Sequence, residues 1–301
     1  MDDVQLICIA DCHFGQRRPV ARAGDWKQAR RRVLDQLWEL QATYKCPIVC
    51  AGDILHSWRE PAELVNFLLR YMPTIHSIAG NHDCPWHDLK ELSRSAFWTL
   101  VEAGKVVYIP PGKPVEVNPG RPIRLHGFPV GHPVKPLAEP HDMAIEVAVC
   151  HEYVWRDGTN YVGAKSDTHV ETWKARTKGY DLIIVGDNHH SFLAEFRKRV
   201  LWNCGGLMRR NADEIDYSPS VGLFLTDGTM KRHFLDVSKD EWDNTGNLMD
   251  MSKADVSGFV DELASLAAAG LDFGEAVKRT LDEMKPSDSV RKAVLGALDS
   301  K

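Results

Sequence analysis

The stretch QLICIADCH at residues 5–13 runs from a mostly apolar segment directly into an aspartate and a histidine. The same order recurs four times along the chain, with a short apolar run before each polar cluster. The five clusters are DCH at 11–13, GDILH at 52–56, GNHD at 80–83, CHE at 150–152 and GDNHH at 186–190. Because open α/β sheets build their sites at the carboxyl ends of strands, the pattern predicts that these side chains meet at a sheet edge.

The segments between the clusters alternate between strand and helix patterns. Strands are expected at 47–51, 74–79, 144–150 and 181–185, and helices at 25–44, 60–71 and 89–103. This βαβαβα order predicts a parallel core with right-handed connections. Over 106–128, and again after residue 190, short β-rich runs separated by turn residues are typical of antiparallel hairpins.

Near residue 238 the pattern changes to three short helices, which divides the chain into domains at 1–238 and 239–301. Ser252 and Asp255 have the spacing of a capping box before the first helix, and Pro286 ends the second. Short helices need a surface to pack on. Two roles remain open for 239–301: a cap over the catalytic domain, or a docking element for a partner.

The composition excludes several classes of protein. No apolar stretch approaches the roughly 20 residues of a membrane span, and the acidic start MDDVQLICIAD is unlike a signal peptide. The seven cysteines have no paired spacing, which favours the reducing cytoplasm over a disulfide framework. With a net charge of −5, the chain binds nucleic acid only through local patches, bound metal or a partner. Its short basic runs, such as 30–32 and 209–210, are interpreted as solvated faces.

The residue types in the clusters suit a pair of divalent metal ions. Asp11 and His13 are two residues apart in an extended segment, so both side chains point to one side and can share an ion. Asp53 can bridge two cations with one oxygen each, and Asn81 offers a hard amide oxygen. His151, Asp187 and His189 complete two shells of mixed nitrogen and oxygen. Two ions about 3.5–4 Å apart can clamp a phosphate and lower the pKa of a bridging water.

The order DxH, GD, GNHD, H and GxxH over residues 4 to about 236 resembles the calcineurin-like metallophosphoesterase superfamily. Within that superfamily, GDILH at 52–56 and NCGGLMR at 203–209 are similar to the SbcD-type nucleases of DNA repair. The resemblance implies an α/β fold, namely a four-layer α-β-β-α sandwich with a small C-terminal helical extension. It also implies that hydroxide formed between two divalent ions, Mn²⁺ or else Mg²⁺, attacks a phosphodiester.

The family pattern gives each matching residue a role. The first metal would be held by Asp11, His13, Asp53 and His189, and the second by Asp53, Asn81, His151 and Asp187. His82 would protonate the leaving oxygen or stabilise charge on the phosphorane, and Asp83 would hydrogen-bond its imidazole. His56 would contact the scissile phosphate; the other interpretation is a solvent-facing histidine at the start of a helix.

Asp187 departs from the family pattern, which has a histidine at this position in a GHxH cluster. A carboxylate adds negative charge and hardness, which predicts a preference for Mn²⁺ or Mg²⁺ over Zn²⁺. Two alternatives remain open. Asp187 does not coordinate and the second ion is loosely held, or His190 competes with His189, although its side chain should point the other way.

The leading functional hypothesis is a cytoplasmic, Mn²⁺-dependent DNA exonuclease and endonuclease. The resemblance implies a partner, an SMC-like ABC ATPase of the SbcC type, and a homodimer, with no membrane involved. The same metals would serve a small-molecule phosphodiesterase or phosphatase acting on cyclic nucleotides or nucleotide polyphosphates. A third hypothesis is a scaffold that keeps the fold without the chemistry, although scaffolds of this superfamily typically lose ligands or the GNHD histidine.

Overall fold

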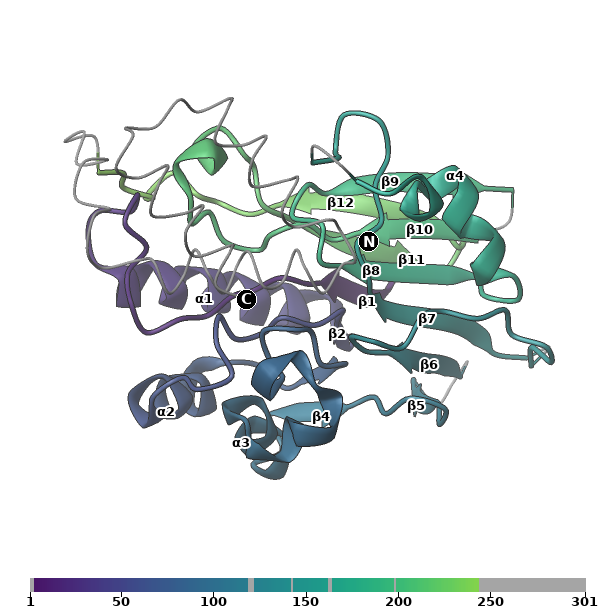
Figure 1. Cartoon of the computed structure of the whole chain (residues 1–301), viewed down its shortest axis with the longest axis horizontal. Helices are drawn as coiled ribbons and strands as arrows, with labels where there is room; N and C mark the ends of the chain where they lie inside the picture. The colour runs from purple at the N-terminus through teal and green to yellow at the C-terminus, as the bar shows by residue number, and fades with distance from the viewer. Residues whose placement is uncertain (1–2, 119–121, 142, 162–163, 198, 244–301) are drawn as a thin grey trace, which may run out of the picture. The chain divides into compact units, whose positions relative to one another are not determined.

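The computed structural model describes residues 3–118, 122–141, 143–161, 164–197 and 199–243. Two six-stranded sheets lie at the centre of this part of the chain (Figure 1). The first sheet, in the order β12-β11-β1-β2-β3-β4, consists of β1 (Val4–Ile9), β2 (Ile48–Cys50), β3 (Ile75–Ser77), β4 (Val106–Tyr108), β11 (Ser220–Leu225) and β12 (Met230–Phe234). The second, in the order β5-β6-β7-β8-β10-β9, consists of β5 (Val115–Val117), β6 (Ile123–Phe128), β7 (Ile145–His151), β8 (Leu182–Gly186), β9 (Phe192–Phe196) and β10 (Arg199–Asn203).

Both sheets combine parallel and antiparallel strands: the first is antiparallel on one side only, and the second at both edges. β1 to β4 run parallel, as the βαβαβα pattern predicts, and β11 and β12 form the expected hairpin beside β1. In the second sheet, β6, β7, β8 and β10 are parallel, while β5 and β9 pair antiparallel at the edges. The prediction of hairpins throughout 106–128 is wrong for β4, which lies parallel to β3 in the first sheet. The chain crosses to the second sheet after the IPPGKP turn, and the hairpin there is β5–β6.

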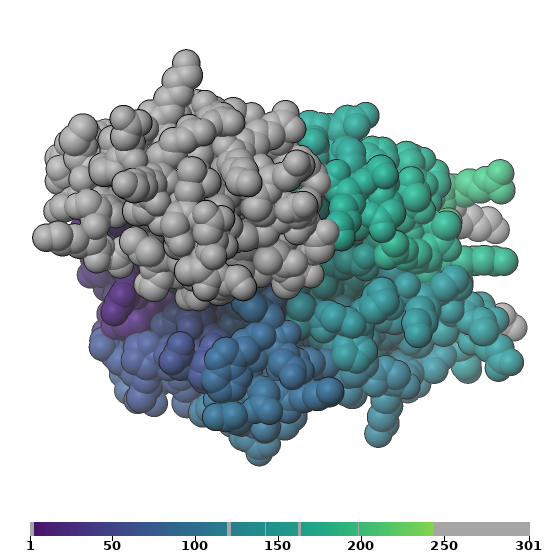
Figure 2. All heavy atoms as spheres, in the orientation of Figure 1, coloured from purple at the N-terminus to yellow at the C-terminus, as the bar shows by residue number. Residues whose placement is uncertain are grey.

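Three apolar layers hold helices and sheets together. α1 (Trp26–Tyr44), α2 (Ala62–Tyr71) and α3 (Ala96–Glu102) cover the outer face of the first sheet, and α4 (Val170–Trp173) covers that of the second (Figure 1). Between the sheets, Cys8 and Val49 of the first pack with Val147, Ile184 and Trp202 of the second. Residues of α2 and α3 form the blue surface at the lower left of the space-filling view (Figure 2). The four-layer α-β-β-α sandwich is therefore confirmed.

The helix expected over 89–103 is divided in two. A 3₁₀ helix occupies Leu89–Arg94, and α3 starts only after Ser95. Ser95 has extended backbone angles, and its hydroxyl accepts the N–H of Trp98, so it caps α3 and ends the preceding turn. Apolar spacing does not reveal this break because both halves bury residues on the same side, Leu92 in the first and Phe97 in the second.

The seven cysteines are all buried free thiols, which agrees with their interpretation as small apolar side chains. Over the described ranges, none of the helices combines the length and apolar character that crossing a bilayer requires.

A buried ion cluster ties the end of the described chain to the catalytic domain. Asp240 lies 2.7 Å from Nη2 of Arg22 and 3.1 Å from Nη2 of Arg209, and the Trp242 ring packs on both guanidinium groups. Residues 239–243 thus pack against the catalytic domain, although the predicted boundary lies before them. The remainder of the expected helical extension, residues 244–301, lies outside the described residues.

Candidate metal centre

The five polar clusters come together at the carboxyl ends of strands from both sheets. The first three follow β1, β2 and β3 of the first sheet, and the last two end β7 and follow β8 of the second. Backbone hydrogen bonds join them: the N–H of Asp11 donates to the carbonyl of Gly52, and the N–H of Asp187 donates to both carboxylate oxygens of Asp11. The site is therefore assembled between two sheets rather than along the edge of one.

The candidate ligands form two groups, one around Nε2 of His13 and the other around Nε2 of His151. Nε2 of His13 lies 3.1 Å from Nε2 of His189. Nε2 of His151 lies 2.8 Å from Oδ1 of Asn81 and 3.9 Å from Oδ1 of Asp187. Each group brings together residues that the family pattern gives to the same ion. The site is therefore a candidate for binding two cations.

Asp53 connects the two groups. Its Oδ2 lies 3.7 Å from Nε2 of His13 and 3.5 Å from Nε2 of His151. Its Oδ1 accepts the backbone N–H of His82 instead, at 2.9 Å. Oδ2 is therefore the oxygen that faces both imidazoles, while Oδ1 also holds the backbone of the next loop; one oxygen for each cation stays a prediction.

The backbone at the site is conformationally unusual. Four of the predicted ligands have left-handed backbone angles: Asp11 (φ 48°), His13 (φ 43°), Asp53 (φ 53°) and Asp187 (φ 85°). Side chains rarely adopt this region, and holding each residue there costs on the order of 1–3 kcal/mol. Such strain concentrates at functional sites, and here it turns successive side chains from the strand ends into the same space.

Burial keeps two of the candidate histidine ligands unprotonated, the form that binds metal. Burial lowers the pKa of His13 well below its usual range, with a further contribution from His82. Burial also lowers the pKa of His189.

Nδ1 of His151 lies 2.7 Å from the carbonyl of Ala51, to which its N–H donates, so Nε2 is the nitrogen that faces the site. Burial would lower the pKa of His151, but the carboxylates of Asp53, Asp187 and Asp11 raise it well above its usual range, so a cation must displace the proton on Nε2. Neutral imidazoles are the form that binds metal.

The carboxylates of the site differ in pKa: burial raises the pKa of Asp11 and Asp187, whereas Asp53 is held as an anion. Burial alone would raise the pKa of Asp53, but the imidazoles of His151 and His82 hold it well below its usual range. Among the described residues, three groups have donor atoms within 4.8 Å of one another: Asp11, His13 and His189; Asp11, Asp53 and His151; and the imidazoles of His13, His56 and His82. Mixed imidazole and carboxylate donors of this kind fit divalent ions such as Mn²⁺, Mg²⁺ or Zn²⁺.

Asp187 lies at the border of the second group. Its backbone N–H orients Asp11, and its carboxylate faces His151 at 3.9 Å. Next to it, His189 points toward His13, whereas the ring of His190 packs against Tyr217 with ring centres 6.4 Å apart. The geometry therefore favours His189 over His190 as the ligand.

His82 and His56 form a pair of imidazoles above the first ligand group. Their rings are stacked with centres 5.7 Å apart, and the His82 ring lies 4.7 Å from that of His13. Nδ1 of His82 is 2.8 Å from the carbonyl of His56, so it carries the proton and Nε2 is directed elsewhere. His56 itself is exposed, as expected of a residue that either meets substrate or faces solvent.

Asp83 does not have the role predicted for it. Its carboxylate accepts three backbone N–H groups, from Ile54, Leu55 and Gly80. The residue that fixes the His82 tautomer is His56, through its carbonyl. The prediction that Asp83 hydrogen-bonds the imidazole is therefore wrong, because this fully buried carboxylate is taken up by the loops that follow β2 and β3.

This position allows a stability prediction. We expect Asp83→Ala to lower the free energy of unfolding of the metal-free protein by roughly 3 kcal/mol or more, since three buried N–H groups lose their acceptor. Urea unfolding measures this loss. Asp88→Ala removes an exposed aspartate that accepts the N–H of Lys90, and should cost about 1 kcal/mol. Unchanged stability in Asp83→Ala, with only kcat reduced, would restore the catalytic interpretation.

Arg210 and Gly80 support the site and were not recognised from the sequence. Arg210, expected on a solvated face, donates from Nη1 to the carbonyl of His13 at 2.7 Å. Arg209 beside it is buried in the ion cluster with Asp240. At Gly80, an added Cβ would lie 2.1 Å from Oδ1 of Asp53. Two features of the sequence indicate these residues. The basic pair directly after NCGGLM indicates the arginines, and the glycine before Asn81 indicates that the backbone there lies close to Asp53.

We expect Gly80→Ala to weaken metal binding by at least roughly tenfold and to destabilise the protein by about 1–3 kcal/mol. The new methyl group would also come within 2.5 Å of the backbone nitrogen of Asp53, so the loop that bears this carboxylate must move. Isothermal titration with Mn²⁺ and thermal unfolding measure the two effects. Gly112→Ala is the control for Mn²⁺ affinity, because its Cβ meets no described atom within 4 Å; its φ of +76° should lower stability by about 1–2 kcal/mol without touching the metal site. Wild-type Mn²⁺ affinity in Gly80→Ala would show that Asp53 is not held as described.

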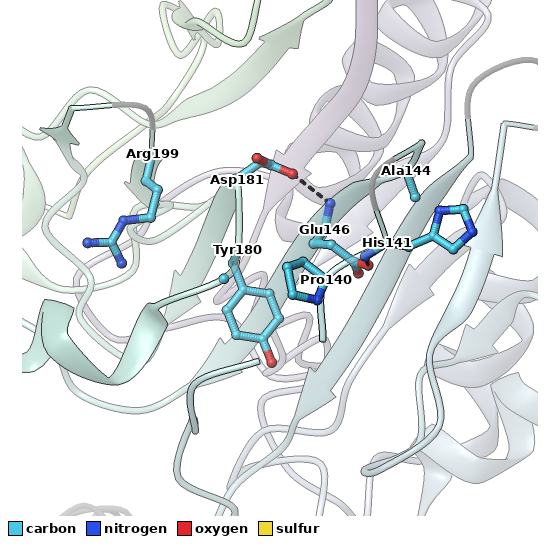
Figure 3. A pocket seen from close by; sticks show the side chains of 8 residues that line it. Pro140, His141, Ala144, Glu146, Tyr180, Asp181 and Arg199 are labelled. Carbon is cyan, nitrogen blue, oxygen red and sulfur yellow. Dashed lines mark hydrogen bonds between the residues drawn. The ribbon is translucent and has the colours of Figure 1, made fainter. Parts of the chain in front are cut away.

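A separate cavity of about 360 Å³ lies at the amino ends of β7 and β8, away from the candidate ligands (Figure 3). Its buried carboxylate, Glu146, accepts hydrogen bonds from Arg124, His126 and the backbone of His141, and its own N–H donates to Asp181. Burial would raise the pKa of Glu146, but these partners hold it below its usual value. The polar groups of the cavity bind one another, so we interpret this network as structural.

Known proteins place the chain among phosphoesterases. Residues 4–191 match the sequence profile of the calcineurin-like phosphoesterase family, a span that contains all five clusters. No curated protein matches the chain.

Among solved structures, the chain is similar to a novel archaeal phosphodiesterase at 11% identity and a TM-score of 0.40, covering 76% of this chain and 99% of that one. The protein TT1561 of Thermus thermophilus has 13% identity and a TM-score of 0.46, covering 77% and 100%. A putative 5′-nucleotidase from Staphylococcus aureus has 11% identity and a TM-score of 0.46, covering 79% and 53%.

Proposed function

The chain belongs to the calcineurin-like phosphoesterase family, and we propose that it is a Mn²⁺-dependent phosphodiesterase that hydrolyses DNA in the manner of SbcD-type nucleases. The observation that carries the proposal is the position of Oδ2 of Asp53 between Nε2 of His13 and Nε2 of His151. One carboxylate oxygen that faces two imidazoles supports the proposal, because it is placed to be a ligand shared by two ions.

The ligands divide into two sets that share Asp53. Asp11, His13, Asp53 and His189 would hold one ion, and Asp53, Asn81, His151 and Asp187 the other. When bound, the ions would polarise the phosphate and lower the pKa of a water between them. Asp187 in place of a histidine supports Mn²⁺ or Mg²⁺ over Zn²⁺, because it adds a hard anionic donor.

The remaining steps belong to side chains outside the ligand sets. With Nδ1–H of His82 donating to the carbonyl of His56, Nε2 is the atom that can deliver a proton to the leaving oxygen. The stacked His56 ring keeps that imidazole in place and offers a second nitrogen to a phosphate oxygen. The rings of His13, His56 and His82 thus surround one face of the site.

DNA is proposed as the substrate because GDILH places His56 beside His82, as the SbcD-type pattern does. An SMC-like ATPase partner and a homodimer remain predictions. The net charge of −5 supports a partner, since a chain with more acidic than basic residues gains little from its overall charge when it binds a duplex.

The test is hydrolysis of linear and circular DNA beside 2′,3′-cyclic nucleotides, with Mn²⁺, Mg²⁺ or Zn²⁺ added to metal-free protein. We expect cleavage of DNA with Mn²⁺ giving the highest turnover. Turnover of cyclic nucleotides alone would favour a small-molecule phosphodiesterase. Two bound ions without hydrolysis of any diester would favour a scaffold, and highest turnover with Zn²⁺ would contradict the metal preference.

A further inference from the structure

Two tryptophans form an aromatic pair beside the candidate metal centre. Trp58 and Trp86 lie with ring centres 5.2 Å apart at an angle of 50°. Trp86 is 62% exposed, which is unusual for so large an apolar side chain. The contacts of this indole with Trp58 and Arg94 leave most of its surface open to solvent, so it is a candidate for contact with a ligand.

An arginine accompanies each ring of the pair. The guanidinium carbon of Arg59 lies 4.6 Å from the centre of the Trp58 ring, and that of Arg94 lies 5.1 Å from the Trp86 ring. Arg59 is exposed, and the Arg94 side chain is 60% exposed and forms a surface ion pair with Glu91 at 2.8 Å. Aromatic faces with positive charges beside them combine the two features that bind single-stranded nucleic acid: stacking surfaces for bases and cations for phosphates.

The pair is tied to both catalytic histidines through short segments. Trp58 follows His56 by two residues and Trp86 follows His82 by four, so the chain limits the separations to about 7 Å and about 14 Å between α-carbons. The carbonyl of Trp58 accepts the N–H of Ala96 at the start of α3, which fixes the first ring. A base stacked here therefore belongs to a nucleotide at or near the one whose phosphate lies at His82.

The backbone that presents Trp86 is held in an unfavourable conformation. Trp86 and His87 both have left-handed angles, with φ of 51° and 59°. Nδ1 of His87 lies 3.0 Å from the carbonyl of Asn81, so the strained turn is connected to the segment that bears a predicted ligand. Bulky residues rarely adopt left-handed angles because they are strained there. The strain at Trp86 therefore points to a function for its exposed ring.

We infer that the Trp58–Trp86 pair stacks unpaired bases of a DNA strand whose phosphodiester lies at the metal centre. The inference rests on the proposed function and adds its substrate form: a single strand or a frayed end, rather than an intact duplex. A duplex keeps its bases stacked on one another, whereas an unpaired base has a free face for an indole.

The test compares Trp86→Ala with wild type in binding and in cleavage. Binding of a fluorescent single-stranded oligonucleotide is measured by anisotropy in EDTA, so that no strand is cut. Cleavage is then measured with Mn²⁺ on the same oligonucleotide and on bis(p-nitrophenyl) phosphate, which has no base. We expect Trp86→Ala to raise Kd and KM for the oligonucleotide by roughly tenfold, since one stacked base is worth about 1–3 kcal/mol. Hydrolysis of bis(p-nitrophenyl) phosphate should be unchanged, and Trp86→Phe should restore most of the affinity.

Two controls make the result specific to bases. Trp38→Ala removes another exposed indole, on α1, which bonds the carbonyl of Tyr71, and it should bind like wild type. An oligonucleotide with abasic sites should bind wild type about tenfold more weakly and Trp86→Ala no more weakly than the intact strand does.

The outcomes separate this inference from the proposed function. Unchanged oligonucleotide binding in Trp86→Ala overturns the stacking, even if the protein hydrolyses both substrates. If Trp86→Ala loses affinity for a mononucleotide and for the oligonucleotide by the same factor, the pair binds a single base and not a strand. Absence of hydrolysis in wild type overturns the proposed function alone, because the anisotropy measurement still decides whether the pair holds bases.

Discussion

Asp53→Asn should lower kcat/KM for any phosphodiester that the protein hydrolyses by roughly 10³-fold or more. Asp53 is the residue that faces both ligand groups, through Oδ2 at 3.7 Å from His13 and 3.5 Å from His151. An amide has the shape of the carboxylate but not its charge, so the two ions would lose the ligand that they share. Losing about 4 kcal/mol of transition-state stabilisation corresponds to this reduction in rate.

The same substitution should remove the stabilisation that Mn²⁺ gives to the folded protein. A bound ion raises Tm because it binds the native state alone, and this increase should disappear in Asp53→Asn. The Tm of the metal-free protein should fall, since the amide loses the attraction between Asp53 and His151, although an amide oxygen in place of Oδ1 can still accept the N–H of His82. Metal content after dialysis and Tm with and without Mn²⁺ measure both effects.

Asp35→Asn is the matched control, because this carboxylate lies on α1 and pairs with Arg31 at the surface. It should retain wild-type kcat/KM and metal content. If Asp53→Asn kept two ions and wild-type turnover, Asp53 would not be the shared ligand, and the assignment of a two-ion centre to these loops would be wrong.

The positions of the ligands could be predicted because they depend on strand ends. An apolar run followed by Asp11, Asp53 or Asp187 marks the end of a buried strand, and parallel strands bring their ends together. That the ends belong to two different sheets could not be predicted, because it depends on how the sheets pack across residues such as Cys8 and Trp202. Local pattern thus predicted the elements, while their pairing depended on contacts distant in sequence.

The hydrogen-bond partners of the loops could not be predicted for a related reason. Asp83 follows His82 directly, yet its carboxylate turns to the N–H groups of Ile54 and Leu55, nearly thirty residues away. Left-handed angles at Asp11 and Asp53 set the directions of the loops, and no rule of alternation applies there. Arg209 likewise forms a buried ion pair with Asp240, which charge patterning alone would place at the surface.

His82 provides the second large effect. We expect His82→Ala to lower kcat for DNA by about 10²–10⁴-fold, the usual contribution of a positioned general acid. We expect this loss to leave metal binding intact, because His82 bonds Asp53 through its backbone N–H; a loss of metal would instead make His82 a ligand together with His13 and His56, whose ring nitrogens lie within 4.8 Å of its own. Metal content and the Mn²⁺-dependent rise in Tm should therefore equal those of wild type.

The leaving group distinguishes proton donation from simple charge stabilisation. A deoxyribose oxygen needs a proton as its bond to phosphorus breaks, whereas p-nitrophenolate leaves without one. If Nε2 of His82 delivers that proton, His82→Ala should lose far more activity on DNA than on bis(p-nitrophenyl) phosphate. If the imidazole stabilises charge on the phosphorane instead, both substrates should lose activity by similar factors.

His132→Ala is the control for removal of an exposed imidazole, since its ring bonds the carbonyl of Val130 within its own turn. It should hydrolyse both substrates as wild type does. If His82→Ala kept full activity on DNA, the imidazole of His82, 4.7 Å from that of His13, would have no role in the reaction. A selective loss on DNA, with both ions retained, would assign the proton to Nε2, because the carbonyl of His56 already occupies Nδ1.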